Sequence, residues 1–534
     1  MERVSAEELF KEFKDHSVAE FFKKNRQMLG YSGMVRSLTT IVHEYVTNSL
    51  DACEEANIMP SIKVSVRETG ENKYIVEVDD NGPGIPKNFI GRALGVVLAG
   101  TKFHRYMQQR GQQGIGAAGC TLFAQVTTGK PVHTKSETEN SAYECDVSID
   151  VKSNKPIIAN LKDVEKTGTT GLSVVAEVAD VKYEKSDHGV YEYIKRTALA
   201  NPHAEIKLVE PDGKEQVFPR SVNELPKRPF AIRPHPLGLE VNDLLEFAHA
   251  SENRTISSFL ISTFSRVTAK KVNELKESAK SVDFGKDPHQ MTWADAEEII
   301  KAIKATKWIA PDTNSLSTIG ERQIGAAIKS ILNPSFFYVT ERKPKVFRGG
   351  IPFVVEAGVA YGGNSGKVQQ NGATGGVILR FANRVPLLFD SANCAITEAV
   401  REIQWRRYGI SNFDEEPVSV FVNVSSVYVP YAGVGKQAIA GEEEIVEEIK
   451  LAVMDSARKM QRYISNRREM GLEKSRYETI LRYAGQLAKD ISELTGSSYD
   501  EVNRSIRLLI SSKYKRALKE GEEEGQQKPG SEAR

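Results

Sequence analysis

The sequence predicts an α+β protein that is built from several domains. Its 534 residues exceed the length that a single hydrophobic core usually serves. Strand-like runs alternate with amphipathic helices in the first part of the chain, purely helical sequence follows, and long apolar strands then precede a long helix. These changes of pattern divide the chain into residues 1–29, 30–226, 227–316, 317–472 and 473–534.

Residues 1–29 form a charged N-terminal arm. The arm has no apolar run long enough for a signal peptide or a membrane span, so we expect no membrane association and a cytoplasmic location. Ser5 and Ser17 each stand three residues before a glutamate, which is the spacing of a capping box. The arm is therefore predicted to hold two short helices.

Residues 30–226 are predicted to form an α/β sandwich, whose first helix carries a polar face. Glu44, Asn48 and Asp51 follow one another at i, i+4 and i+7, so their side chains share one side of the helix. The other side is apolar and comprises Val42, Tyr45, Val46, Leu50 and Cys53. Such a polar face is ordinarily solvated surface, but the segments that follow it indicate half of a metal and phosphate site.

A strand over residues 74–78 leads into Asp80 and then a glycine turn. Gly82 and Gly84, followed by Ile85, let the backbone approach a flat ligand closely, because glycine has no Cβ. A carboxylate acceptor beside bare backbone suits an exocyclic amine. The turn therefore predicts a site for the base of a nucleotide.

A glycine-rich segment at residues 111–119, GQQGIGAAG, opens the next apolar helix. Backbone N–H groups at such a helix start bind phosphate without a lysine. The candidate contacts are Gly111, Gln112, Gln113, Gly114, Ile115, Gly116, Ala117 and Ala118. The polar, basic stretch before it is predicted to be a solvated loop that acts as a mobile lid, with Thr101 and Lys102 near the phosphates.

Four motifs follow one another along the chain, which are the polar helix face, the glycine turn after Asp80, the glycine-rich segment and Gly-Thr-Thr at residues 168–170. Through these four motifs the chain resembles the GHKL ATPase superfamily. Within it the chain most resembles the B subunits of topoisomerase VI, the archaeal type IIB enzyme. The resemblance implies a Bergerat-type ATP-binding fold with ATP and Mg²⁺ as cofactors. It makes Glu44 the catalytic base and Asn48 the metal ligand, and it assigns Thr169, beside Thr170, to holding Asp80 or a water at the adenine.

Residues 227–316 begin with a proline-rich linker and continue as short amphipathic helices. The segment resembles by position the helix-two-turns-helix domain of the same family. Either DNA contact or simple packing is compatible with it.

Residues 317–472 change to long strands and then to a helix from Glu442 to about Asn466. This order resembles the family's βα transducer domain with its stem helix. Taken alone, Lys436 is an ordinary loop lysine, but the family match places it on the γ-phosphate of ATP as a catalytic and nucleotide-binding residue.

Residues 473–534 are predicted to form two more helices, near 477–494 and 500–518, before a polar tail. The tail's charge and glycine content predict disorder. The helices suit either partner docking or a small bundle on the stem.

Charge and cysteine content exclude some classes of protein. The chain has 72 basic and 71 acidic residues, which argues against a histone-like positive coat but leaves room for a local basic groove. Its four cysteines, Cys53, Cys120, Cys145 and Cys394, contain no C-x-x-C pair. Neither a disulfide framework nor a zinc site is predicted, and the thiols are expected to be reduced core residues.

The resemblance implies an ATP-driven clamp that acts on DNA. Two copies would bind ATP, dimerise and trap a duplex, while a partner A subunit in an A₂B₂ assembly supplies the strand break; a nucleoid-associated enzyme that relaxes supercoils is expected. No Asp-x-Asp pair occurs, so the chain is not expected to cut DNA alone. The alternatives are a mismatch-repair type ATPase clamp and an ATP-gated chaperone.

Overall fold

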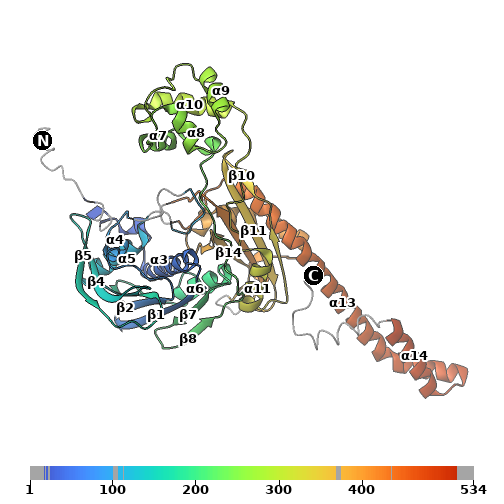
Figure 1. Cartoon of the computed structure of the whole chain (residues 1–534). Coiled ribbons are helices and arrows are strands. Elements are labelled where there is room, and N and C mark those ends of the chain that lie inside the picture. The colour runs from blue at the N-terminus through green and yellow to red at the C-terminus, as the bar shows by residue number, and fades with distance from the viewer. Residues whose placement is uncertain are drawn as a thin grey trace, which may run out of the picture.

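The computed structural model describes residues 17, 20–21, 24–99, 106–111, 114–368, 374–433 and 436–513. A first α/β domain, a small helical domain, a second α/β domain and a long helical stem follow one another along the chain (Figure 1). The predicted α+β class is confirmed. The predictions for residues 1–16, for Thr101, Lys102, Gln112 and Gln113, and for the tail from residue 514 concern segments outside the described residues.

The first domain is built on an eight-stranded sheet in the order β5-β4-β3-β6-β2-β1-β7-β8. Its strands are β1 (Ser61–Gly70), β2 (Lys73–Asp80), β3 (Val132–Glu137), β4 (Ala142–Asp150), β5 (Lys155–Asp163), β6 (Gly171–Ala179), β7 (Glu205–Val209) and β8 (Glu215–Phe218). β1 and β7 are parallel, and the other neighbours are antiparallel. Buried and more exposed side chains alternate along β2 and β6, as expected where only one face of a sheet is covered.

Helices cover that face of the sheet (Figure 1). They are α3 (Met34–Glu55), α4 (Ile90–Gly95), α5 (Gly116–Thr128) and α6 (Val190–Ala200). The apolar stripe predicted on α3 is buried, with Val42 and Val46 fully enclosed in the core. Because this stripe faces the sheet, the polar face of α3 is directed away from the core.

The helical domain has a hydrophobic core of its own. Its helices are α7 (Val241–His249), α8 (Ile256–Thr263), α9 (Ala269–Ser278) and α10 (Trp293–Ala305). The hydroxyls of Thr255, Thr268 and Thr292 cap the starts of α8, α9 and α10 by accepting backbone N–H groups. These caps explain why such short helices begin where they do.

The second α/β domain contains a six-stranded sheet in the order β10-β11-β16-β14-β15, with β9 also paired to β11. Its strands are β9 (Phe336–Glu341), β10 (Lys345–Phe347), β11 (Ile351–Tyr361), β14 (Val377–Ala382), β15 (Val385–Pro386) and β16 (Val418–Ser426), while β12 (Lys367–Val368) and β13 (Thr374–Gly375) form a separate pair. β16 is buried along its whole length, as a central strand covered on both faces should be. The helices α11 (Glu321–Leu332) and α12 (Ala395–Arg401) belong to this domain.

The stem differs from the sequence prediction. We expected a helix that ends near Asn466 and a separate one over 477–494, but α13 runs without interruption over Glu443–Thr495, which is about 80 Å. The intervening residues contain no proline, and the single Gly471 costs only about 1 kcal/mol in a helix. Gly496, in the left-handed conformation, ends α13, and α14 (Tyr499–Lys513) packs back on it (Figure 1).

The two α/β domains share apolar contacts. Leu388 and Phe389 of the second domain lie in the hydrophobic core of the first. Leu199 of α6 packs in turn with Ile324 and Ile328 of α11. All four cysteines are buried and unpaired, which confirms their prediction as core thiols. No helix among the described residues is long and apolar enough to cross a membrane.

Candidate nucleotide-binding site

The polar face of α3 divides into an accessible part and a buried part. Asn48 is exposed and Glu44 is half-buried, with 30% of its side chain accessible. Asp51, one turn further, is buried at 7% and is engaged by Arg110 rather than directed to solvent. The structure therefore presents Glu44 and Asn48 to a ligand, while Asp51 has a different environment from the one its spacing predicted.

Asp80 lies at the end of β2, below α3. Its Oδ2 accepts a hydrogen bond of 2.6 Å from the Ser49 hydroxyl, and its Oδ1 accepts from the backbone N–H groups of Gly82 and Leu172 at 2.9 and 3.3 Å. Burial raises the pKa of the Asp80 carboxyl, and these three donors oppose the rise. The carboxylate is thus held in place as an acceptor at the edge of the sheet.

Ser49 is a functional candidate that the sequence analysis missed. It follows Asn48 directly but faces the sheet, so its neighbours in sequence gave no sign of a polar partner. The hydroxyl of Thr169, which we expected near Asp80, lies 3.1 Å from that of Thr167. A direct bond from Ser49 therefore fixes Asp80 here, and the role of Thr169 in binding a water stays a prediction.

The glycine turn after Asp80 is packed too closely for a side chain. Gly84 has a φ of 70°, and a Cβ there would lie 2.4 Å from the carbonyl oxygen of Glu137. Ile85 is fixed by Ser136, whose hydroxyl accepts the Ile85 N–H at 2.8 Å and donates to its carbonyl at 3.0 Å. The sequence prediction of a close backbone approach at this turn agrees with this geometry.

Glu137 also fixes the segment that contains Gly168, Thr169 and Thr170. Its carboxylate accepts the Thr167 N–H at 2.9 Å, the Thr167 hydroxyl at 2.8 Å and the Gly168 N–H at 2.8 Å. The two backbone segments on either side of Asp80 are therefore linked through one strand, β3. Thr169 is exposed and Thr170 is half-buried at this edge.

The start of α5 lies against Glu44. A Cβ added to Gly116 would be 1.9 Å from Oε2 of Glu44, so the carboxylate contacts bare backbone at the first turn of the helix. Gly114 has a φ of 57°, which favours glycine at this bend. Gly111, Gly114, Ile115, Gly116, Ala117 and Ala118 are the predicted phosphate contacts that the structure describes. Ile115, Gly116, Ala117 and Ala118 lie at the start of α5, where backbone N–H groups bind phosphate favourably, and Gly111 and Gly114 precede it.

Lys436 belongs to the second α/β domain. It lies in the loop before α13, in a left-handed conformation with a φ of 50°, and its backbone N–H donates to the Gly433 carbonyl at 3.1 Å. Burial lowers the pKa of His43, Glu44 raises it, and the Lys436 ammonium lowers it again. The Lys436 charge therefore acts on His43, the residue that precedes Glu44 on α3.

Comparisons with known proteins agree with this geometry. The family described as histidine kinase-, DNA gyrase B-, and HSP90-like ATPase matches residues 33–170, and the family described as topoisomerase VI B subunit, transducer, matches residues 311–476. Two relatives named as the B subunit of type 2 DNA topoisomerase 6 are close in sequence. That of Pyrococcus horikoshii is 46% identical over 96% of this chain and 97% of its own, and that of Methanothermobacter thermautotrophicus is 44% identical over 94% and 98%.

The crystal structure of the ATPase region of Saccharomyces cerevisiae topoisomerase II is 12% identical and superposes over 85% of this chain and 98% of its own, with a TM-score of 0.40.

Proposed function

Because this chain belongs to the family of topoisomerase VI B subunits, we propose that it closes on duplex DNA as an ATP-driven clamp. It is the ATP-hydrolysing B subunit of a type II DNA topoisomerase. The observation that best supports clamp closure is that the Lys436 charge, from the second α/β domain, lowers the pKa of His43, which precedes Glu44 on α3 in the first. A mismatch-repair clamp or a chaperone is not favoured, because the relatives that match over their full length are topoisomerase subunits.

Glu44 is proposed as the general base. Its carboxylate lies beside the first turn of α5, where phosphate oxygens would be held by backbone N–H groups. A carboxylate at that point can accept the proton of the water that attacks the γ-phosphate. Asp80, fixed by Ser49, would accept a hydrogen bond from the amino group of adenine.

Asn48 is proposed as the protein ligand of Mg²⁺. Its amide is exposed on the same face of α3 as Glu44, and an amide oxygen is a suitable ligand for this hard cation. Among the described residues no group of three or more His, Cys, Asp and Glu forms a metal cage. An ion held by one side chain, phosphate oxygens and water is the usual arrangement for Mg²⁺ with a nucleotide. When bound, the ion would offset phosphate charge.

Lys436 is proposed to sense the γ-phosphate. Its ammonium would lose an anionic partner when that phosphate leaves, and the loop that carries it leads into α13. A change at one phosphate would thereby alter the position of the transducer and its stem. The N-terminal arm is proposed to join two copies when ATP binds, although its first sixteen residues lie outside the described part of the chain.

The end of the stem is proposed as the docking surface for the A subunit in an A₂B₂ assembly. The hairpin of α13 and α14 exposes large apolar side chains, with Leu494 at 85% and Leu509 at 70%. Apolar groups gathered on an exposed element indicate a protein interface. An enzyme that acts on chromosomal DNA would then work in association with the nucleoid.

Relaxation of supercoiled plasmid tests the proposed function. With ATP and Mg²⁺, the purified chain should do nothing alone and should relax the plasmid when the A subunit is added. A chain truncated at Glu473 should lose relaxation but keep ATP binding, and Leu508→Ser with Leu509→Ser should weaken A-subunit binding without removing the helices. Relaxation or covalent DNA adducts formed by this chain alone would contradict the division of labour.

A further inference from the structure

A buried ion cluster lies at the C-terminal end of α3, beyond the nucleotide site. The Arg110 guanidinium donates to Oδ1 of Asp51 at 2.7 Å and to Oε1 of Glu54 at 2.6 Å. It also donates to Oδ1 of Asn201 at 2.6 Å, after the end of α6. Only 5% of the Arg110 side chain is accessible, so solvent screens these contacts weakly.

The second α/β domain contributes a second arginine to the same carboxylate. Arg384 donates from one terminal nitrogen to Oε2 of Glu54 at 3.3 Å and from the other to the Ser317 hydroxyl at 2.6 Å. His203 completes the cluster, with Nε2 at 2.8 Å from Oε1 of Glu54. Burial would raise the pKa of Glu54, but Arg110 and Arg384 hold it well below its usual range. Glu54 is therefore a charged bridge between the two domains.

The backbone at Arg384 is held in an unfavourable conformation. Asn383 and Arg384 join β14 to β15, and both have positive φ angles, of 48° and 67°. Two such residues between antiparallel strands form the kind of turn that asparagine and glycine tolerate, whereas arginine pays a steric cost there. The Arg384 N–H is fixed by Oδ1 of Asn423 at 3.1 Å, so the turn presents the guanidinium to Glu54 in a defined direction.

Residues 108–110 are the described end of the predicted lid, and they lie between α3 and the second α/β domain. Gln108 and Arg110 are buried there, at 4% and 8%, so this part of the segment is not the solvated loop that the sequence predicted, because its polar side chains bind buried partners. Gln108 exchanges two hydrogen bonds with the backbone of Ser317, at 2.7 and 2.8 Å, and the Asn383 amide donates to the Gln109 carbonyl at 3.1 Å. Arg110 then attaches this segment to α3, immediately before Gly111. One set of contacts therefore joins three segments: α3, which carries the proposed general base Glu44, residues 108–110, and the second α/β domain.

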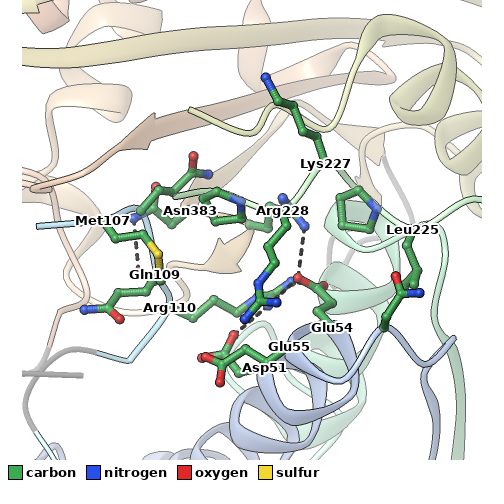
Figure 2. A pocket seen from close by; sticks show the side chains of 15 residues that line it. Asp51, Glu54, Glu55, Met107, Gln109, Arg110, Leu225, Lys227, Arg228 and Asn383 are labelled. Atoms are coloured by element: carbon green, nitrogen blue, oxygen red, sulfur yellow. Dashed lines mark hydrogen bonds and ion pairs between the residues drawn. The ribbon is translucent and has the colours of Figure 1, made fainter. Parts of the chain in front are cut away.

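An open space borders this junction. A cavity of about 280 Å³ lies beside the cluster, bordered by the end of α3, residues 107–110, the linker at 225–229 and the Asn383–Arg384 turn (Figure 2). In Figure 2 the side chains of Arg110 and Glu54 meet at this cavity. The ion pairs and hydrogen bonds named above therefore link the three segments directly beside this space.

We propose that Arg384 is a positioning residue for ATP hydrolysis, which acts through Glu54 and Arg110 to couple the orientation of the transducer to the lid and to α3. The proposal rests on the proposed function, because DNA held between the stems supplies the force that reorients the transducer. Arg384 touches no nucleotide atom in this scheme. It carries a second connection between the domains, separate from Lys436.

The test compares Arg384→Gln with wild type in complex with the A subunit, by ATPase assays with and without plasmid. Without DNA, the variant should have a KM for ATP within about twofold of wild type, because the nucleotide contacts are intact. With DNA, its stimulation of kcat should fall about fivefold or more, within the usual range for coupling between sites. Arg342→Gln is the matched control, since Arg342 pairs with Glu448 and Asp455 inside the second domain only.

The outcomes separate this proposal from the proposed function. Wild type that shows no stimulation by DNA would contradict the clamp itself. Full stimulation in folded Arg384→Gln, or an equal loss in Arg342→Gln, would overturn the positioning role. If thermal unfolding shows that Arg384→Gln is not folded, Gln108→Ala is tested in its place. This substitution removes the two hydrogen bonds to Ser317 without leaving a buried charge unpaired. Its stimulation should fall in the same direction, and unchanged stimulation overturns the proposal.

Discussion

The two ends of the polar stripe on α3 have different environments. Glu44 and Asn48 are accessible, and Glu44 contacts the start of α5, whereas Asp51 and Glu54 are enclosed by two arginines and a histidine. One helix therefore presents groups to a ligand at one end and holds a domain junction at the other. A regular spacing of polar residues shows that they share a face, but it does not show that they share a function.

The largest effect on ATP hydrolysis is expected at the accessible end of α3, which carries Glu44 and Asn48. Glu44→Ala should lower kcat for ATP hydrolysis by about 10²- to 10⁴-fold, because a general base acts mainly in the transition state. ATP binding, measured by calorimetry, should be retained. Glu55→Ala is the control from the same helix, since Glu55 is an exposed glutamate at its far end. Near-normal turnover by Glu44→Ala would show that Glu44 is not the general base.

The accessible end of α3 and the turn at Asp80 could be predicted from the sequence, because each of them belongs to a local motif. Asp80 is the last residue of β2, and Gly82 and Gly84 follow it, so residues that are close in sequence determine the geometry of the turn. The partners of Glu54 are not neighbours. Arg110, His203 and Arg384 are single charged residues in three distant segments, and only the fold brings them together. Ser49 was missed for a similar reason, since its partner lies on another element.

Gly116→Ala tests the position of the general base, because it should displace the Glu44 carboxylate without removing it. The new Cβ would collide with the end of the Glu44 side chain, which is flexible and can turn away. We expect kcat to fall about 10²-fold, the effect of a catalytic group displaced by about 1 Å. The melting temperature should not fall, because alanine is a better helix former than glycine.

Gly471→Ala is the matched control for this substitution, since a Cβ in that part of the stem meets nothing within 4 Å. It should leave kcat unchanged. A Gly116→Ala variant that unfolds early but hydrolyses ATP normally would show that the packing against Glu44 has no catalytic role.

Lys436→Ala tests the connection that the nucleotide itself makes between the domains. Losing one contact to a charged phosphate should lower kcat by about tenfold or more. Compaction by a non-hydrolysable ATP analogue, measured by solution scattering, should also be reduced. Lys459→Ala on the stem is the control, because its ammonium lies over the Tyr338 ring inside the second domain. Equal compaction of Lys436→Ala and wild type would show that this lysine does not control closure.

The smallest effect on ATP binding is expected from Ser49→Ala, at the edge of the site where adenine is proposed to bind. Asp80 keeps two backbone donors when the hydroxyl is lost, so KM for ATP should rise only about threefold at neutral pH.

The pH dependence of this variant is the more informative measurement. The ionised Asp80 carboxylate accepts a stronger hydrogen bond from adenine than the protonated form does, and burial already raises the pKa of this carboxyl. ATP affinity should therefore fall as pH decreases through that raised pKa. The Ser49 bond lowers the pKa of Asp80, so the variant should lose affinity at a higher pH than wild type does. Calorimetric titrations of ATP across the acidic range measure both midpoints. Identical midpoints would show that Ser49 does not control the ionisation of Asp80.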